Sequence, residues 1–536
     1  MIVKAIRAIL RNRIRIALLA VIVAAAGSGG LLWYRFWRPP PPLEVALWYW
    51  HSPFTVTASD AEQLKIIGVR RLFVRAGTFH IDGAGVRLTQ PQTWASRADG
   101  VDIHLVFNFD ASVLRAFPAV PVESLAIAVL REFQRVRADA ERSGLRVAGV
   151  QLDLDCPTSR LSKYADLLHR IHAGLTPRTT VLSITALPTW YRSGNLARVL
   201  AEIDFAAPQY YEANVGASRS EYATVSQLRN TEDGLASAGW RGAPFFAGIP
   251  AYGHALVYSG SGRLVGAFHD MGLTEAIRSR KFRLERAFGA DEHGQPATKS
   301  NYSGEDVYEL RAMVSADGAR DQPTGYHVVY EIPTPTLIAR QVAVLRARRP
   351  SSCLGMILFR YPEPAESSTV PLSAISALLQ GRPATPQLQV RMKCNLAPWE
   401  SIDSAAQSPL SPVDVTVSVT NVGSSSAFVG ADAVSVTLTL NRAAIEDISS
   451  AGSDSIETLF QQDNASASDP PIRASMSRAN IIRIGRISLA AGETQVLGTL
   501  RLRAEAGANV GGNWTARCPG GFDSVSGVIA PVALLR

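Results

Sequence analysis

The first two-thirds of the chain repeats one pattern of hydrophobic and polar positions. A short apolar run ends in polar residues, and a stretch with the apolar spacing of a helix follows it. Eight such runs lie at residues 45–50, 71–74, 103–107, 147–154, 180–185, 205–208, 244–249 and 356–359. The helical spacing is clearest at residues 122–142, 161–171 and 335–346. Near-continuous apolar strands that alternate with amphipathic helices predict a parallel sheet covered by helices.

Eight strand–helix units are the number that closes a (β/α)8 TIM barrel, an α/β fold. In such a barrel the functional side chains gather at the carboxyl ends of the strands. A doubly wound open sheet is the alternative, but no glycine-rich phosphate turn follows the first strand. We therefore expect a barrel over residues 44–380.

The C-terminal region follows a different pattern. Val413, Val415, Val417 and Val419 alternate with polar residues, and residues 434–440, 482–489 and 495–503 are further candidate strands. Short alternating strands between Gly, Ser and Asn turns predict an antiparallel β-sandwich over residues 388–536. Residues 417–423 and 490–494 resemble Ig-like modules of exported bacterial proteins. A linker at residues 381–387 separates the two domains.

The N-terminus is typical of a membrane anchor. Residues 16–34 carry no charge and are long enough to span a bilayer, and basic residues precede them. By the positive-inside rule, residues 1–38 are a cytoplasmic tail and transmembrane helix, and the bulk of the chain lies in the periplasm or outside the cell. A cleaved signal peptide is the alternative, with a small-residue site near Ala24 and Ala26. Residues 39–43 form a proline-rich spacer.

The net charge of +8 is largely a property of this N-terminus. The first 38 residues hold seven of the 54 Lys and Arg residues and none of the 46 acidic residues. The remainder is almost neutral, which argues against a nucleic-acid partner. The nine histidines give no indication of a metal site at the predicted strand ends, and we expect neither a metal nor a cofactor.

The fourth strand carries the most informative polar residues. Because side chains alternate along a strand, Gln151, Asp153 and Asp155 share one face. Two neighbouring carboxylates repel each other, which raises the pKa of at least one and prepares it for acid–base chemistry. The alternative is a strand whose polar face meets water, with Asp155 capping the next helix.

These segments resemble glycoside hydrolase family 18, the chitinase-type barrels. Val150, Asp153, Asp155 and Pro157 fall on that family's Asp-x-x-Asp-x-Asp-x-Glu signature, and Asp204, Gln209, Tyr211 and Glu212 fall on its sixth-strand motif. Residues 248–253 resemble its Gly-x-Pro-x-Tyr-Gly, and residues 355–359 its eighth strand. Residues 46–53, 153–160 and 182–190 resemble, more closely, a bacterial family of uncharacterised exported proteins.

The resemblance implies a TIM barrel with a small inserted lobe at residues 254–332. It also implies a glycosidase that acts on an extracytoplasmic polysaccharide or cell-wall glycan. The family's proton donor is the Glu that closes the signature, and Pro157 occupies that position here. Either another carboxylate supplies the proton, or the barrel binds a glycan without cutting it.

For a hydrolase, glycoside cleavage needs a protonated carboxyl and a second carboxylate across the sugar. Asp155 is the candidate acid, Asp153 would set its pKa, and Glu212 is the candidate partner. The resemblance gives Tyr211 the role of orienting the sugar. The remaining candidates for sugar contacts are Trp190, Tyr252 and Phe359 as stacking faces, with Gln209, His51 and Asp110.

The four cysteines fit an oxidising compartment. Cys156 follows the fourth strand and Cys353 precedes the eighth, so these two lie at opposite ends of a parallel barrel and are not expected to pair. Cys394 and Cys518 bracket the C-terminal domain. We expect them to form a disulfide that clamps its first and last strands.

The charge bias before the apolar segment predicts the orientation of the chain in the membrane. Alkaline phosphatase fused after residue 45 should be active, because the enzyme folds only outside the cytoplasm. An inactive fusion would reverse the predicted orientation.

Overall fold

The computed structural model describes residues 42–83, 85–211, 227–237, 242–268, 271–313, 325–363, 366–396, 410–462 and 470–535. The predicted membrane segment and Glu212 lie outside these ranges. Within the described ranges, no helix has the length and apolar character needed to cross a membrane. The chain divides into residues 1–43 and residues 44–536, and the following concerns the second unit.

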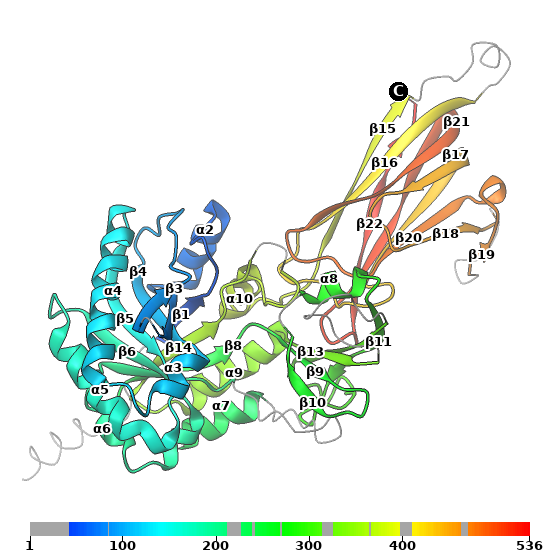
Figure 1. Cartoon of the computed structure of the whole chain (residues 1–536). Coiled ribbons are helices and arrows are strands. Elements are labelled where there is room, and N and C mark those ends of the chain that lie inside the picture. The colour runs from blue at the N-terminus through cyan, green and yellow to red at the C-terminus, as the bar shows by residue number, and fades with distance from the viewer. Residues whose placement is uncertain are drawn as a thin grey trace, which may run out of the picture. The chain divides into compact units, whose positions relative to one another are not determined.

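Eight parallel strands form a closed barrel (Figure 1). They are β1 (Glu44–Tyr49), β2 (Arg71–Asp82), β4 (Asp102–Phe109), β5 (Arg146–Asp153), β6 (Val181–Ala186), β7 (Phe205–Pro208), β8 (Phe245–Pro250) and β14 (Cys353–Phe359). The sheet closes because β1 pairs in parallel with both β14 and β2. β3 (Gly85–Thr89) extends β2 as an antiparallel hairpin. The predicted barrel is confirmed, and the doubly wound alternative is wrong.

Helices connect the strands and cover the barrel (Figure 1). They are α2 (Ala58–Ile67), α3 (Ala111–Ala116), α4 (Val122–Arg142), α5 (Leu161–Gly174), α6 (Leu196–Leu200), α7 (Gln227–Ala236), α9 (Pro335–Arg348) and α10 (Leu372–Leu379), with short 3-10 turns at Thr158–Arg160 and Pro188–Arg192. α4 buries Leu125, Val129, Phe133 and Val136, which follow one another at helical spacing. This apolar stripe is the reason the sequence predicts the helix at these residues.

A lobe of five antiparallel strands follows β8. Its order is β10 (Leu264–Ala267), β9 (His254–Tyr258), β13 (His327–Pro333), β12 (Glu305–Ala312) and β11 (Phe282–Ala290), with helix α8 (Leu273–Arg278). Side chains such as Val257 and Tyr330 form a hydrophobic core on one face of this sheet. Phe428 and Val429 of the C-terminal domain pack into the same core. The lobe therefore buries part of the C-terminal domain as well as its own sheet.

The C-terminal domain is antiparallel throughout its described residues and has a hydrophobic core of its own. Its strands are β15 (Leu388–Leu396), β16 (Ser411–Asn421), β17 (Val434–Ser450), β18 (Ser455–Phe460), β19 (Ile472–Arg473), β20 (Ile481–Arg486), β21 (Thr494–Arg517) and β22 (Ser524–Ala533), and a 3-10 turn lies at Met476–Arg478. The prediction of short strands is wrong, because β17 has 17 residues and β21 has 24. One edge of β21 pairs first with β16 and then with β22.

The predicted disulfide between Cys394 and Cys518 is not present, because none of the four cysteines, all of them among the described residues, forms a disulfide. Cys394 lies opposite Val415, which pairs with Leu500 of β21, whereas Cys518 follows the far end of that strand. Leu500 and Ala516 pair with positions fourteen residues apart on β17, which at about 3.3 Å per residue separates the two thiols by roughly 45 Å. The prediction failed because it assumed short strands with both ends close together.

Asp306 on β12 joins the lobe to the C-terminal domain. Its buried carboxylate accepts hydrogen bonds from the Tyr302 hydroxyl (2.8 Å) and from the backbone N–H of Gly520 (3.0 Å). Burial raises the pKa of Asp306 to about 7, although the donors and the Arg517 charge act in the opposite direction. The folded protein therefore favours the protonated carboxyl, because the donors offset only part of the cost of burying its charge.

This buried carboxyl predicts a loss of stability with rising pH. The pKa in the folded state exceeds that in the unfolded state, so the stabilisation present below about pH 4 declines until about pH 7, by up to about 4 kcal/mol. Asp306→Asn removes this titration. Thermal unfolding between pH 4 and pH 7 should show the variant's melting temperature gaining on that of the wild type as pH rises; parallel curves would contradict the assignment.

Candidate functional site

The carboxyl ends of the barrel strands form a mouth whose floor is polar. The side chain of Trp48 is buried in the barrel and donates from Nε1 to Oε1 of Gln151 at 2.7 Å. Gln151 in turn donates to the Ser183 hydroxyl at 3.3 Å. A buried amide needs such partners, and this chain fixes the orientation of the indole ring beneath the mouth.

Asp153, the last residue of β5, lies above this floor with both carboxylate oxygens engaged. Oδ1 accepts from the Thr185 hydroxyl at 2.7 Å and from Gln209 Nε2 at 3.3 Å, and Oδ2 accepts from Asn108 Nδ2 at 3.0 Å. Burial raises the pKa of Asp153, and the three donors oppose that rise because they stabilise the ionised carboxylate. Four neighbouring strands, β4 to β7, thus meet at one carboxyl group.

Asp155 differs from this arrangement. The strand ends at Asp153, so the alternation that placed both carboxylates on one face stops before Asp155, which is exposed. Leu154 and Cys156 on either side are buried. The next helical turn starts with Pro157 as its N-cap, without a side-chain cap, so the alternative role of Asp155 as a helix cap is wrong. Asp155 remains an exposed carboxylate next to the mouth.

Four half-buried aromatic side chains lie at the mouth, and we call them the mouth aromatics: Trp50, Tyr211, Tyr252 and Phe359. The Phe359 ring is central. It stacks on Tyr211 with 5.1 Å between ring centroids and 13° between planes. It meets Trp50 edge-on at 5.6 Å and Tyr252 edge-on at 6.2 Å. Fully buried Trp48 packs against Tyr211 and Phe359 from below.

Trp190 does not belong to this group, which corrects its predicted role as a stacking face. Its side chain is fully buried, its Nε1 donates to the Cys156 carbonyl at 2.9 Å, and its ring meets Tyr164 edge-on at 5.9 Å. The ring therefore anchors the segment after β6 to the segment after β5. An aromatic residue after a strand end can be either a sugar-stacking ring or a buried structural ring, and only its packing in the fold shows which.

His51 and Asp110 are held by other side chains. His51 Nδ1 lies 2.5 Å from Glu363 Oε1, and its Nε2 lies 2.8 Å from the Tyr361 carbonyl oxygen. Asp110 is the N-cap of α3 and lies 2.6 Å from His80 Nδ1. Burial alone would raise the pKa of Asp110, but hydrogen bonds from Ser112, His80 and the α3 backbone lower it to about 2. Asp110 is thus a structural cap rather than a proton donor.

Arg360 joins the mouth aromatics to the loop that follows β14. Its guanidinium lies over the Tyr252 ring, 4.1 Å from the centroid, and forms an ion pair with Glu366. Glu366 also accepts from the backbone N–H of Glu363 at 3.0 Å. Cation–π stacking and the ion pair together fix the position of this guanidinium.

Sequence reasoning left Asn108, Thr185, Trp48 and Arg360 out of the site. Asn108, Thr185 and Arg360 lie at or next to the carboxyl end of a predicted strand, and Trp48 lies two residues before one, which was the available signal. Glu212, the candidate second carboxylate, lies outside the described residues. Among the residues that the structure describes, no three His, Cys, Asp or Glu side chains are grouped so that they could hold a metal ion.

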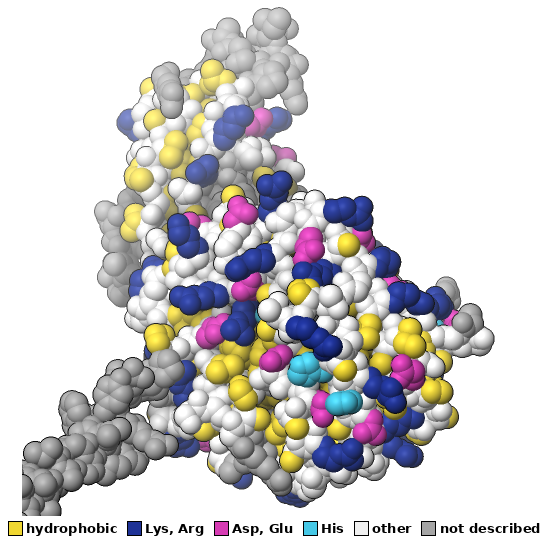
Figure 2. Space-filling model, turned by 90° about the vertical axis from the view of Figure 1, so that its left-hand side faces the viewer, with side chains coloured by type: hydrophobic (Ala, Val, Ile, Leu, Met, Phe, Trp, Pro, Cys, Tyr) yellow, Lys and Arg dark blue, Asp and Glu magenta, His cyan; other side chains and the backbone are white. Residues whose placement is uncertain are grey.

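The face shown in Figure 2 carries dispersed charges. Lys and Arg side chains are distributed among acidic, hydrophobic and other side chains instead of forming one basic patch. This face of the protein therefore offers no electrostatic footprint for a polyanion.

Residues 123–278 match the family described as "Domain of unknown function (DUF3142)". No curated protein matches the chain in sequence.

Several solved structures are similar to this one. They include a chitinase from Chromobacterium violaceum (14% identity, TM-score 0.38, 63% of this chain and 98% of that chain covered). The spore cortex-lytic enzyme SleL of Bacillus megaterium matches at 13% identity and a TM-score of 0.38, covering 64% of this chain and 75% of that chain. Catalytic domain 2 of the Ostrinia furnacalis Group II chitinase matches at 12% identity and a TM-score of 0.38, covering 64% of this chain and 97% of that chain. Similarity at this level does not establish a shared activity.

The donors around Asp153 predict a pH-dependent cost when one of them is removed. Thr185→Val keeps the side-chain shape but deletes the hydroxyl, so it should destabilise the protein by about 1–3 kcal/mol when Asp153 is ionised. The loss should grow as the pH rises and Asp153 ionises, because a protonated carboxyl depends less on the donor. Thr180→Val, a buried threonine just before the same strand, is the control. If the loss of stability in Thr185→Val is as independent of pH as the loss in Thr180→Val, the role of Thr185 is refuted.

Proposed function

We propose that this protein is a membrane-anchored, extracytoplasmic, glycoside hydrolase-like protein that binds a glycan at the barrel mouth. The observation that carries the proposal is the group of mouth aromatics beside the hydrogen-bonded Asp153. Sugars present apolar C–H faces and polar hydroxyl edges, so their sites combine aromatic rings with a few fixed polar groups. The half-buried rings of Tyr211 and Phe359 and the carboxylate of Asp153 supply both kinds of contact.

The polar half of the site is pre-organised. Gln209 and Asn108 each donate a hydrogen bond to Asp153, and these bonds fix where a sugar hydroxyl or amide could bind. A rigid site loses less conformational entropy when the ligand binds. This arrangement supports recognition of a specific sugar orientation.

Cleavage is the further step of the proposal. Asp155 would give its proton to the leaving oxygen, and Glu212 would act as the second carboxylate across the sugar. Asp153 is better suited to positioning than to proton donation, because three donors occupy its oxygens. The negative charge of Asp153 would raise the pKa of the neighbouring Asp155, so that Asp155 could hold the proton it donates.

A glycan-binding barrel without catalysis is the second candidate, and two observations favour it. By the resemblance to the chitinase signature, Pro157 falls on the position of the proton donor, and proline has no proton to give. Asp155, the remaining candidate acid, is exposed to solvent. In this case the same aromatic and polar groups bind the glycan, and the anchor keeps the protein beside it at the cell surface.

Removal of one stacking ring should weaken glycan binding. Tyr211→Ala should lower the affinity for an oligosaccharide by about tenfold or more, whereas Tyr211→Phe, which keeps the ring, should bind nearly as well as the wild type. Isothermal titration calorimetry with glycans selected on an array measures both. Equal affinities for Tyr211→Ala and the wild type would rule out the mouth as the binding site.

The catalytic step has its own test. Asp155→Asn should abolish turnover of chromogenic glycosides while glycan binding persists, because the amide keeps the shape but supplies no proton. Asp166→Asn, an exposed carboxyl on α5, is the matched control and should retain turnover. Binding without turnover in the wild type itself would establish the second candidate instead.

A further inference from the structure

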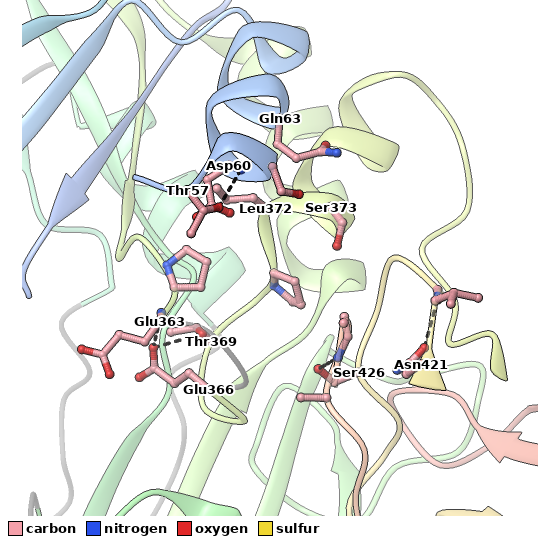
Figure 3. Close-up of a pocket in the computed structure, with 18 residues that line it drawn as sticks. Thr57, Asp60, Gln63, Glu363, Glu366, Thr369, Leu372, Ser373, Asn421 and Ser426 are labelled. Carbon is pink, nitrogen blue, oxygen red and sulfur yellow. Dashed lines mark hydrogen bonds between the residues drawn. The ribbon is translucent and has the colours of Figure 1, made fainter. Parts of the chain in front are cut away.

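A groove runs along the junction between the barrel and the C-terminal domain, next to the mouth. On the barrel side it is lined by the start of α2, the loop after β14 and the start of α10; on the other side it is lined by residues 421–423, 426 and 490–492 (Figure 3). Its volume is about 340 Å³. We call it the junction groove. It is large enough for part of a chain-like ligand.

A second cavity is lined in part by the same loop. It has a volume of about 820 Å³ and is lined by Tyr252, Arg360 and Glu366, by α8 of the lobe and by Glu493 of the C-terminal domain. Glu366 lines both cavities. Tyr252 is one of the mouth aromatics, so the second cavity begins at the mouth and reaches the junction groove at Glu366.

The walls of the junction groove are held in place by hydrogen bonds. Asn421 donates to the carbonyl oxygens of Ser425 (3.0 Å) and Leu489 (3.2 Å) and accepts from the N–H of Gly423 (3.0 Å). On the barrel side, the Ser373 hydroxyl donates to the Ser424 carbonyl at 2.9 Å, which ties α10 to the opposite wall. Hydrogen bonds therefore hold both walls of the groove in place.

The lining is rich in hydroxyl and amide groups. It includes Thr57, Ser59, Gln63, Thr369, Ser373, Asn421 and Ser426 (Figure 3). Ser59 and Gln63 make no side-chain hydrogen bond to another described residue, so both can bond to a ligand. Such groups match a polyhydroxylated chain, which presents donors and acceptors in alternation.

The charges of the groove exclude one class of glycan. Asp60, Glu363 and Glu366 are part of the lining, and no Lys or Arg side chain lines it within the described residues. His51 and Arg360 pair with Glu363 and Glu366 from outside this groove. A polyanion would meet carboxylates without a free cation to bind.

We propose that the junction groove is a second glycan-binding site, which takes a further segment of the same chain that occupies the mouth. The segment is a polyol without acidic groups, either neutral or bearing ammonium groups. This inference rests on the proposed glycan function and extends it, because it makes the C-terminal domain part of the binding surface. It also gives a reason for the domain to be fixed against the barrel at Ser373.

The test compares short and long oligosaccharides with the full-length protein in detergent. Gln63→Trp fills the groove, and Glu62→Trp places the same ring on the same helix at an exposed position outside the lining. The probes are the disaccharides and octasaccharides of chitin, chitosan, cellulose and polygalacturonate. In the wild type and in Glu62→Trp, the octasaccharide of a neutral or amino glycan should bind at least about tenfold more tightly than its disaccharide.

In Gln63→Trp this ratio should fall toward one, and the polygalacturonate fragments should bind none of the three proteins. An unchanged ratio in Gln63→Trp, or preferred binding of polygalacturonate, overturns the second site while glycan binding at the mouth stands. If the wild type binds none of the probes, the proposed function fails and this inference with it. If Gln63→Trp unfolds, Ser59→Trp, at an exposed position that lines the same groove, gives the same measurement.

Discussion

Closure of the barrel between β1 and β14 is the constraint on which the rest of the structure depends. Once β1 pairs with β14 on one side and β2 on the other, every second side chain of eight strands points into one interior. Polar groups in that interior must bond to each other, as Trp48, Gln151 and Ser183 do. The same closure brings Asp153 and its three donors together from four strands. The mouth is thus a consequence of how the barrel's buried polar groups are satisfied.

Two opposing effects act on the central carboxylate. Burial favours the protonated form of Asp153, and the hydroxyl and amide donors favour the ionised form. Because those donors occupy both oxygens, Asp153 serves as a fixed acceptor at the base of the mouth. Proton donation then falls to a carboxyl nearer the solvent or does not occur.

Most of the barrel could be predicted from the sequence, because parallel strands buried on both faces are near-continuous apolar runs. Helix α4 was also predictable from its apolar stripe. The long strands of the C-terminal domain were not, because alternation looks the same in one long strand as in several short ones, and bulges interrupt it without ending the strand. That error led to the wrong disulfide. In the site, residue type located the mouth but could not separate buried Trp190 from half-buried Phe359, since only packing decides exposure.

The position of Asp155 could not be predicted from the sequence either. The alternation rule holds along β5 up to Asp153, and the sequence does not mark where the strand ends. The roles of Arg360 and Glu366 depend on a stack and an ion pair that only the folded loop creates.

A crystal structure of the protein with a bound oligosaccharide tests the central claim most directly. The account predicts a sugar ring against the faces of Phe359 and Tyr211, with one of its hydroxyl or amide groups within hydrogen-bond distance of Asp153 or Gln209. A glycan bound only on the C-terminal domain, with the mouth free of sugar, would contradict the account.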